Sequence, residues 1–336
     1  MTTESHPNRR EFMRRITGSA LAAIGAGVLG LAFWDRKGPQ VNIPKARDLI
    51  VPDFSVPAQT GVISVAHGSD RVRTVALAVN ALGGMQAFVK PGDKVLLKVN
   101  AAFATPPSLG ATTHPQLVAK TVELCLQAGA GQVRVTDNPI NDPTSCFELS
   151  GIGPAARKAG AELILPAADR FTSYTLPGGR LLRHWPVFSS PLLWADRVIG
   201  LGPVKDHHRS GASLTIKNWY GLLGGRRNIF HQQIHAIIAE LAMMIKPSLV
   251  ILDGTNSMMS NGPTGGSLDD LKATHTLIAG TDPVAVDTLG AELLGKRPSD
   301  LPYLALAEKA GAGTVDYRSL RFSQINESTN QRINES

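Results

Sequence analysis

Short apolar segments alternate with helix-like segments through most of this chain, and this alternation constrains its fold more than any other feature. Seven segments have the pattern of buried strands: 62–65, 94–99, 133–136, 162–165, 197–201, 249–252 and 276–279. Helical patterns such as 115–128 and 283–294 separate them. Strands separated by helices form βαβ units. The sequence therefore predicts an α/β fold, a mainly parallel sheet with helices on both faces, with a peripheral β-hairpin at 171–187.

Residues 1–32 have the pattern of an export signal. Arg9 and Arg10 precede an uncharged stretch from Ile16 to Phe33. A basic region followed by a modest apolar one is typical of signal peptides, and the arginine pair resembles a twin-arginine signal. We expect a periplasmic protein exported by the twin-arginine translocase and cleaved after Ala32. An uncleaved stretch would instead be a membrane anchor, although its four glycines make it weakly hydrophobic.

The rest of the chain is predicted to contain one domain. Residues 33–57 include several prolines and no sustained period, so they are predicted to be a linker. Residues 58–322 would form a single α/β domain. Residues 323–336 are polar, contain Asn-Glu-Ser twice, and are expected to be a frayed tail.

Charge and cysteine content exclude several classes of protein. The first 32 residues hold four arginines and two glutamates, so they account for +2 of the formal charge of +7 and leave +5. No Lys/Arg-rich run remains, which argues against a nucleic-acid partner. Two cysteines are too few for a disulfide scaffold, a four-cysteine zinc site or an intrinsic iron–sulfur cluster. Whether Cys125 and Cys146 form a disulfide stays open.

Polar residues gather just after the predicted strands. They are Asn100, Asp137, the run 205–209, Asp253 and the run 280–282. Ligands of open α/β sheets bind outside the carboxyl ends of the strands, so these positions predict a ligand site.

The run Lys205-Asp206-His207-His208-Arg209 is the densest group of reactive side chains. Adjacent residues of a strand point to opposite faces, so we expect these two imidazoles to point apart and rarely to share a metal. His231 and His235 are four residues apart in a predicted helix, 231–245, which is a metal-ligand spacing, although such a pair is more often structural. Gln232 stands where a zinc protease needs a glutamate, so that class is excluded.

A glycine-rich segment between these two groups could bind an oxyanion. Lys217 and Asn218 lead into Gly224-Gly225-Arg226-Arg227, where backbone N–H groups and arginines suit a phosphate or carboxylate. An exposed structural loop is the alternative. The chain has no G-x-S-x-G and no phosphate-loop motif, and Gly151-Ile152-Gly153 lacks the preceding strand that a dinucleotide site requires.

These motifs, in this order, resemble those of the domain-of-unknown-function family 362 from Gly61 to Asp316. The resemblance rests on Lys98-Val99-Asn100 (with valine in place of the family's proline), Thr113-His114-Pro115, Thr136-Asp137-Asn138-Pro139, Lys205-Asp206-His207, Lys217-Asn218-Trp219-Tyr220-Gly221, His231, Asp253-Gly254, Asn261-Gly262-Pro263 and the run 280–287. Many family members carry ferredoxin-type cysteines that this chain lacks, and the resemblance implies no particular reaction.

The resemblance does imply candidate site residues. His207 and His231 are candidate metal ligands or acid/base groups, and Lys205 and Lys217 candidate catalytic cations. Candidate cofactor- or ligand-binding residues are Lys98, Asn100, His114, Asp137, Asn218, Gly221, Asp253, Asn261, Asp282 and Asp287. Imidazole and carboxylate ligands suit a divalent metal. Asp282 before Pro283 could instead be only a helix N-cap, and 261–263 only a tight turn.

Two functions follow as hypotheses. The first is an exported enzyme that acts on an anionic small molecule, with metal or cofactor assistance. The second is a protein that binds a ligand or assists a redox partner without turnover.

Overall fold

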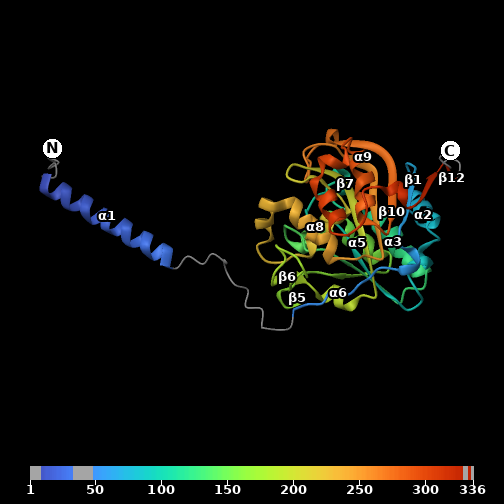
Figure 1. The fold of residues 1–336 in the computed structure, drawn as a ribbon, viewed down its shortest axis with the longest axis horizontal. Coiled ribbons are helices and arrows are strands. Elements are labelled where there is room, and N and C mark those ends of the chain that lie inside the picture. Colours follow the sequence, from blue (N-terminus) through green and yellow to red (C-terminus); the bar gives the residue numbers. More distant parts are fainter. Residues whose placement is uncertain (1–8, 33–47, 328–331, 334–336) are drawn as a thin grey trace. The chain divides into compact units, whose positions relative to one another are not determined.

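The computed structural model describes residues 9–32, 48–327 and 332–333. The chain divides into two compact units, Met1–Lys45 and Ala46–Ser336. Helix α1 (Arg9–Ala32) belongs to the first unit (Figure 1). None of the helices in these described ranges is long and apolar enough to cross a membrane. The first part of the predicted linker, 33–47, lies outside the described residues, as do Phe33 at the expected cleavage site and the tail at 328–331 and 334–336.

The described residues of the second unit form twelve strands and the remaining helices. The strands are β1 (Val62–His67), β2 (Lys94–Lys98), β3 (Gln132–Thr136), β4 (Glu162–Ile164), β5 (Phe171–Tyr174), β6 (Trp185–Phe188), β7 (Arg197–His207), β8 (Gly211–Ser213), β9 (Leu249–Met258), β10 (Leu271–Gly280), β11 (Arg321–Asn326) and β12 (Arg332–Ile333). The helices are α2 (Arg71–Ala81), α3 (Pro115–Gln127), α4 (Pro143–Leu149), α5 (Ile152–Lys158), α6 (Ser190–Trp194), α7 (Thr215–Asn218), α8 (Ile234–Met244), α9 (Pro283–Leu293) and α10 (Pro302–Lys309).

Ten strands form one mixed, mainly parallel sheet. Its order is β12-β11-β1-β10-β9-β7-β2-β3-β4, with β8 paired to β7. Strands β9, β7, β2, β3 and β4 are all parallel, while β10 runs antiparallel to both of its neighbours. Strands β5 and β6 form a separate antiparallel hairpin. The predicted α/β class and peripheral hairpin are therefore confirmed.

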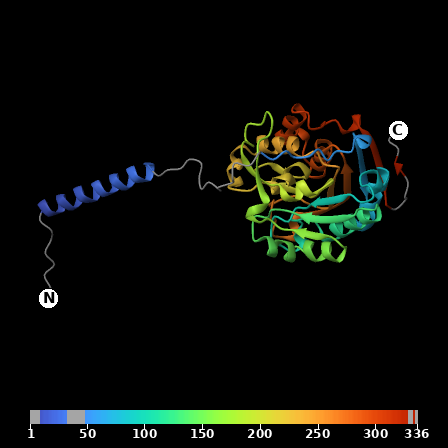
Figure 2. The same ribbon diagram turned by 90° about the horizontal axis from the view of Figure 1, so that it is seen from below.

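Helices cover both faces of the sheet because the side chains of its central strands alternate between two cores (Figure 2). In β9, Leu249 and Ile251 pack into the core that contains α2, α3 and α5, whereas Val250 and Leu252 pack into the core that contains α8, α9 and α10. A stretch buried on both faces is apolar at every position, which is why the sequence shows a continuous apolar run at 249–252.

The strand order reverses next to β2. The chain passes from β2 to β3 to β4 toward one edge, and β7 then pairs on the other side of β2. The three neighbours β7, β2 and β3 are parallel, so their carboxyl ends lie at one edge of the sheet. In α/β proteins this topological switch point is where ligands bind.

Two predicted boundaries were wrong. The predicted linker ran to Pro57, but Leu49 and Phe54 are buried in the core, and the Leu49 N–H donates to Ser173 O at 2.7 Å. The predicted tail began at Ser323, but β11 continues to Asn326 in parallel with β1 and buries Ile325. The first segment contains several prolines and the second is mostly polar, so their compositions resemble those of loops.

Candidate functional site

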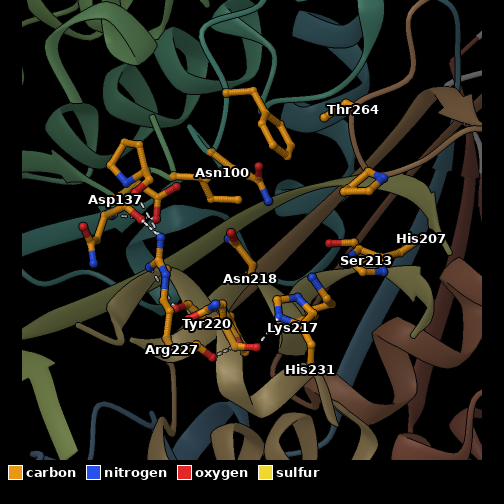
Figure 3. Close-up of a pocket in the computed structure, with 18 of the residues that line it drawn as sticks. Asn100, Asp137, His207, Ser213, Lys217, Asn218, Tyr220, Arg227, His231 and Thr264 are labelled. Atoms are coloured by element: carbon orange, nitrogen blue, oxygen red, sulfur yellow. Dashed lines mark hydrogen bonds between the residues drawn. The ribbon is translucent and has the colours of Figure 1, made fainter. Parts of the chain in front are cut away.

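A cavity of about 1040 Å³ lies at the carboxyl ends of β2, β3 and β7, at the topological switch point. Figure 3 shows Asp137 and Arg227 toward one end of it and His207 and Thr264 toward the other. Nine of the predicted site residues line it: Asn100, Asp137, Lys205, His207, Lys217, Asn218, Gly221, His231 and Asn261. The structure thus brings together residues more than 150 positions apart in the sequence.

A buried ion pair between Lys98 and Asp137 supports one wall of the cavity. Lys98 Nζ lies 2.7 Å from Asp137 Oδ1 and donates to Val99 O and to Asn218 Oδ1, so all three ammonium protons have acceptors. The other Asp137 oxygen accepts the Ala101 N–H. A Cβ at Gly221 would overlap Asp137 Oδ1 and lie 2.8 Å from Lys98 Nζ, so this position requires glycine.

Lys205 is a buried cation without a carboxylate partner. Its Nζ donates to Ala111 O at 2.5 Å and lies 3.4 Å from both Asn100 Oδ1 and Pro263 O. Burial, reinforced by the charge of Lys217, lowers its pKa to about 7. The three oxygen atoms hold the amine in place but do not neutralise its charge.

Lys217 is placed at the cavity by the short helix α7. Among the described residues its ammonium has no hydrogen bond and no ion pair, and Nζ lies 5.6 Å from the centroid of the Tyr220 ring. Burial, with a smaller effect of the nearby Arg227, lowers the pKa of this lysine to about 8. Its charge faces the cavity.

Arg227 connects two segments of the cavity wall by hydrogen bonds. Its guanidinium donates to the carbonyls of Tyr220 and Leu223 on one side and of Asn138 and Pro139 on the other. The sequence predicted this arginine as a fork for an oxyanion or an exposed loop residue. Neither hypothesis included its structural role. The guanidinium donates its hydrogen bonds to four backbone carbonyls, and no carboxylate among the described residues pairs with its charge.

The cavity is therefore strongly cationic. Lys205, Lys217 and Arg227 line it, and the carboxylate that lines it, Asp137, already pairs with Lys98. Burying unpaired charge is costly, and a bound anion would remove that cost.

His207 presents a hydrogen-bond donor to this cavity. Its Nδ1 accepts the backbone N–H groups of Arg209 and Ser210 at 3.1 and 3.3 Å. The neutral ring therefore carries its proton on Nε2. Burial and the charge of Lys217 lower its pKa to about 2, so the ring is neutral at physiological pH.

His231 has the opposite tautomer. Its Nδ1 lies 3.0 Å from Asn228 O, which can only accept, so Nε2 of the neutral ring carries a lone pair. Burial lowers its pKa, and so does the charge of Lys217. His231 can accept a proton where His207 can donate a hydrogen bond.

The expectation that His207 and His208 point apart was wrong. Their rings stack with centroids 5.0 Å apart, because β7 extends to His207 and the chain turns at His208. The metal-ligand spacing of His231 and His235 does not bring these two side chains together on one helix face. Helix α8 begins only at Ile234, and the His235 ring instead stacks on Tyr303.

The donor set does not fit a metal. His207 and His231 stack with ring centroids 6.3 Å apart, and the tautomer of His207 offers a proton rather than a lone pair. Across the described ranges no group of three or more His, Cys, Asp or Glu side chains could hold a metal ion. Cys125 and Cys146 are both free and buried, so the structure contains no disulfide between them.

Five predicted binding residues do not line the cavity. Lys98 lies behind it, as described above. His114 caps α3 by accepting the Gln116 N–H, and Asp253 pairs with Arg71 at 2.6 Å. Asp282 caps α9, as its position before Pro283 allowed, and also accepts the Thr314 N–H.

Asp287 accepts hydrogen bonds from the first two residues of α7. Its carboxylate accepts the N–H groups of Thr215 and Ile216 and the Thr215 hydroxyl, and all three residues are buried. The predicted role of Asp287 as a ligand is therefore replaced by a positioning role, because α7 carries Lys217 and Asn218.

Several cavity residues were missed. Tyr220, Phe103, Ile140 and Phe171 supply apolar surface, and His208 and Ser213 supply polar groups. Tyr220 lies within the motif that contains Lys217, so its position could have been noticed. His208 lies in the run 205–209, which the sequence did single out. Phe171 and Ser213 lie in β5 and β8, and Phe103 and Ile140 in irregular segments, and their sequence carries no such signal.

Comparison with known proteins gives two matches. The family model described as "Domain of unknown function (DUF362)" matches residues 95–292. The thylakoid-associated protein sll1697 of Synechocystis sp. is 29% identical over 239 residues, which cover 68% of this chain and 72% of that protein. No solved structure matches. Because the family model spans more than half of the sequence, this chain belongs to the DUF362 family.

Proposed function

We propose that the cavity binds a small anionic molecule and that the protein is an enzyme acting on it. The observation that carries this proposal is the imbalance of charge: three basic side chains, Lys205, Lys217 and Arg227, line the cavity, while the carboxylate there is already paired, and a bound anion would favour the protonated forms of both lysines. A phosphate or carboxylate would accept hydrogen bonds from Lys217 and from His207 Nε2–H. The aromatic side chains would contact the apolar part of the molecule.

The two imidazoles favour an enzyme over a passive carrier. His231 Nε2 has a lone pair and His207 Nε2 has a proton, both at the cavity that holds the cations. A base and a donor of fixed tautomer are the groups that general acid–base catalysis requires. A ligand that is bound but never converted would instead support the carrier hypothesis.

Replacing Lys217 by methionine should weaken anion binding by roughly 10- to 100-fold, since a hydrogen bond to a charged group contributes about 1.5–3 kcal/mol. Isothermal titration calorimetry with inorganic phosphate and with malonate measures the affinity. Because no described residue hydrogen-bonds to Lys217 Nζ, the variant should unfold at the temperature of the wild type.

Lys272→Met is the matched control, since Lys272 is exposed on β10 away from the cavity. Its affinity for both anions should equal that of the wild type. If the wild type binds neither anion, or if Lys217→Met binds them equally well, the proposal is wrong.

We also propose that the twin-arginine translocase exports this protein to the periplasm. The support is the arginine pair at the start of α1 and the uncharged stretch behind it. Substituting Arg9→Lys and Arg10→Lys together should remove nearly all of the protein from the periplasmic fraction. Arg14→Lys with Arg15→Lys is the control and should leave fractionation unchanged. Export of the first variant at the wild-type level would contradict the proposal.

A further inference from the structure

Lys217 differs from the two fully buried lysines at this site, Lys98 and Lys205, in what surrounds its amine. Lys98 donates to three oxygen atoms, one of them a carboxylate, and Lys205 to three uncharged oxygen atoms. In the described structure Lys217 donates to none, and its side chain is only partly buried. An amine without acceptors loses no hydrogen bond when it reacts.

The surroundings of Lys217 also favour its neutral form. Burial and the charge of Arg227 lower its pKa to about 8. About one tenth of the side chain is then free amine near pH 7, against well below one hundredth for an ordinary lysine. Lysines that are desolvated and placed beside another cation are the ones that proteins use as amine nucleophiles.

We propose that Lys217 forms an imine with an aldehyde or ketone that carries an acidic group, such as a 2-oxo acid. This rests on the proposed anion-binding cavity and adds a carbonyl to the substrate class. In such a substrate Lys205 would attract the acidic group, while Lys217 and His207, which would contact a simple anion, would contact the carbonyl. Four groups line the same cavity and serve this step: Lys217, Lys205, His207 and His231.

The step needs no further reactant. The Nζ lone pair attacks the carbonyl carbon, a C–N bond forms, and the π electron pair moves to the oxygen, which His207 Nε2–H hydrogen-bonds. His231 Nε2 takes one proton from the nitrogen and passes it to this oxygen, which becomes the hydroxyl of a carbinolamine. The second proton of the nitrogen then follows the same route to the hydroxyl, so that water leaves and a neutral imine remains. Amine and carbonyl have become imine and water, with no change of oxidation state.

Lys205 is less suited to be the nucleophile, although its pKa is also lowered. Its Nζ is almost fully buried and contacts three oxygen atoms, which an imine nitrogen could not all satisfy. Its role is to attract the acidic group of the substrate.

Reductive trapping tests the proposal. The full-length protein is incubated with glyoxylate and sodium cyanoborohydride near pH 7, which converts an imine into a stable carboxymethyl-lysine, and peptide mass spectrometry locates the product. Lys217 should be modified on the order of 100-fold faster than exposed lysines such as Lys272, in proportion to the fraction of free amine. The rate should rise from about pH 6, pass half of its maximum near pH 8, and level off only above about pH 9, where deprotonation of Lys217 is nearly complete.

Lys217→Arg separates the imine from anion binding. It keeps the cation but cannot form an imine, so it should still bind phosphate while labelling in the cavity disappears. If Lys217 in the wild type is labelled no faster than Lys272, the imine proposal is overturned, whatever the calorimetry shows. If labelling is fast but neither phosphate nor malonate binds, the anion site is wrong and the reactive amine remains.

Discussion

Replacing Asp287 by alanine should lower the free energy of unfolding by about 3–5 kcal/mol, one of the two largest effects expected in this protein. The carboxylate accepts two buried backbone N–H groups, from Thr215 and Ile216, and the buried Thr215 hydroxyl. Alanine would leave these donors without an acceptor, and each buried unsatisfied donor costs about 1–3 kcal/mol. Urea denaturation followed by circular dichroism measures the change.

The stability that Asp287 contributes to the folded protein should fall as the pH rises. Burial raises the pKa of Asp287 to about 7, above the value near 3.9 of an unfolded chain. A raised pKa means that the folded state holds the proton more tightly. The contribution of Asp287 is therefore complete below about pH 4 and declines until about pH 7. The difference in the free energy of unfolding between the wild type and the Asp287→Ala variant should be larger at about pH 5 than at about pH 8.

Asp169→Ala is the control, since Asp169 is exposed and should change stability by less than about 0.5 kcal/mol. Equal stabilities of the Asp287 variant and the wild type at both pH values would show that this carboxylate does not support α7. Asp287→Asn keeps one oxygen acceptor, so it should be intermediate in stability. Its anion affinity should fall if α7 positions Lys217.

The sequence predicted the central architecture because each central strand carries its own signal. A strand buried on both faces must be apolar at every position, so β2 and β9 could be recognised without any partner. Proline at N1 after a capping side chain likewise placed the starts of α3 and α9 correctly. These are local effects, which a sequence records directly.

The errors arose where long-range contacts decide the structure. Strand β7 continues past Leu201 to His207 because β8 and β9 pair with it, although Lys205 and Asp206 have the composition of a loop. The motif around Asp287 was correctly singled out but wrongly interpreted. Whether a buried aspartate faces a cavity or a neighbouring helix depends on how α9 packs against α7, which residue spacing does not reveal.

Breaking the Lys98–Asp137 pair should have the second large effect. Asp137→Ala leaves a fully buried ammonium beside no counter-charge, and such a change costs about 3–5 kcal/mol. Lys98→Met leaves the carboxylate uncompensated in the same way. The double variant removes both charges, so it should be more stable than Asp137→Ala alone. Urea denaturation of the four proteins gives the coupling energy, expected at about 2 kcal/mol or more.

The pair of Lys120 and Glu123 on α3 provides the matched control. These side chains lie 3.2 Å apart but are partly or fully exposed, so their coupling should be only about 0.3–0.5 kcal/mol. A coupling energy for Lys98 and Asp137 no larger than this would mean that the buried pair contributes no more than a surface one.

The same variants decide whether this pair binds ligand, as the sequence predicted, or only supports the cavity. Its two charges cancel, so if the pair is structural the double variant should bind phosphate within a few-fold of the wild type once it is folded. Asp137→Ala alone would add net positive charge to the cavity and should bind phosphate more tightly. If the double variant folds but loses phosphate binding, Lys98 itself contributes to the anion site. The cations that bind the anion would then include Lys98 at the end of β2 as well as Lys205 and Lys217.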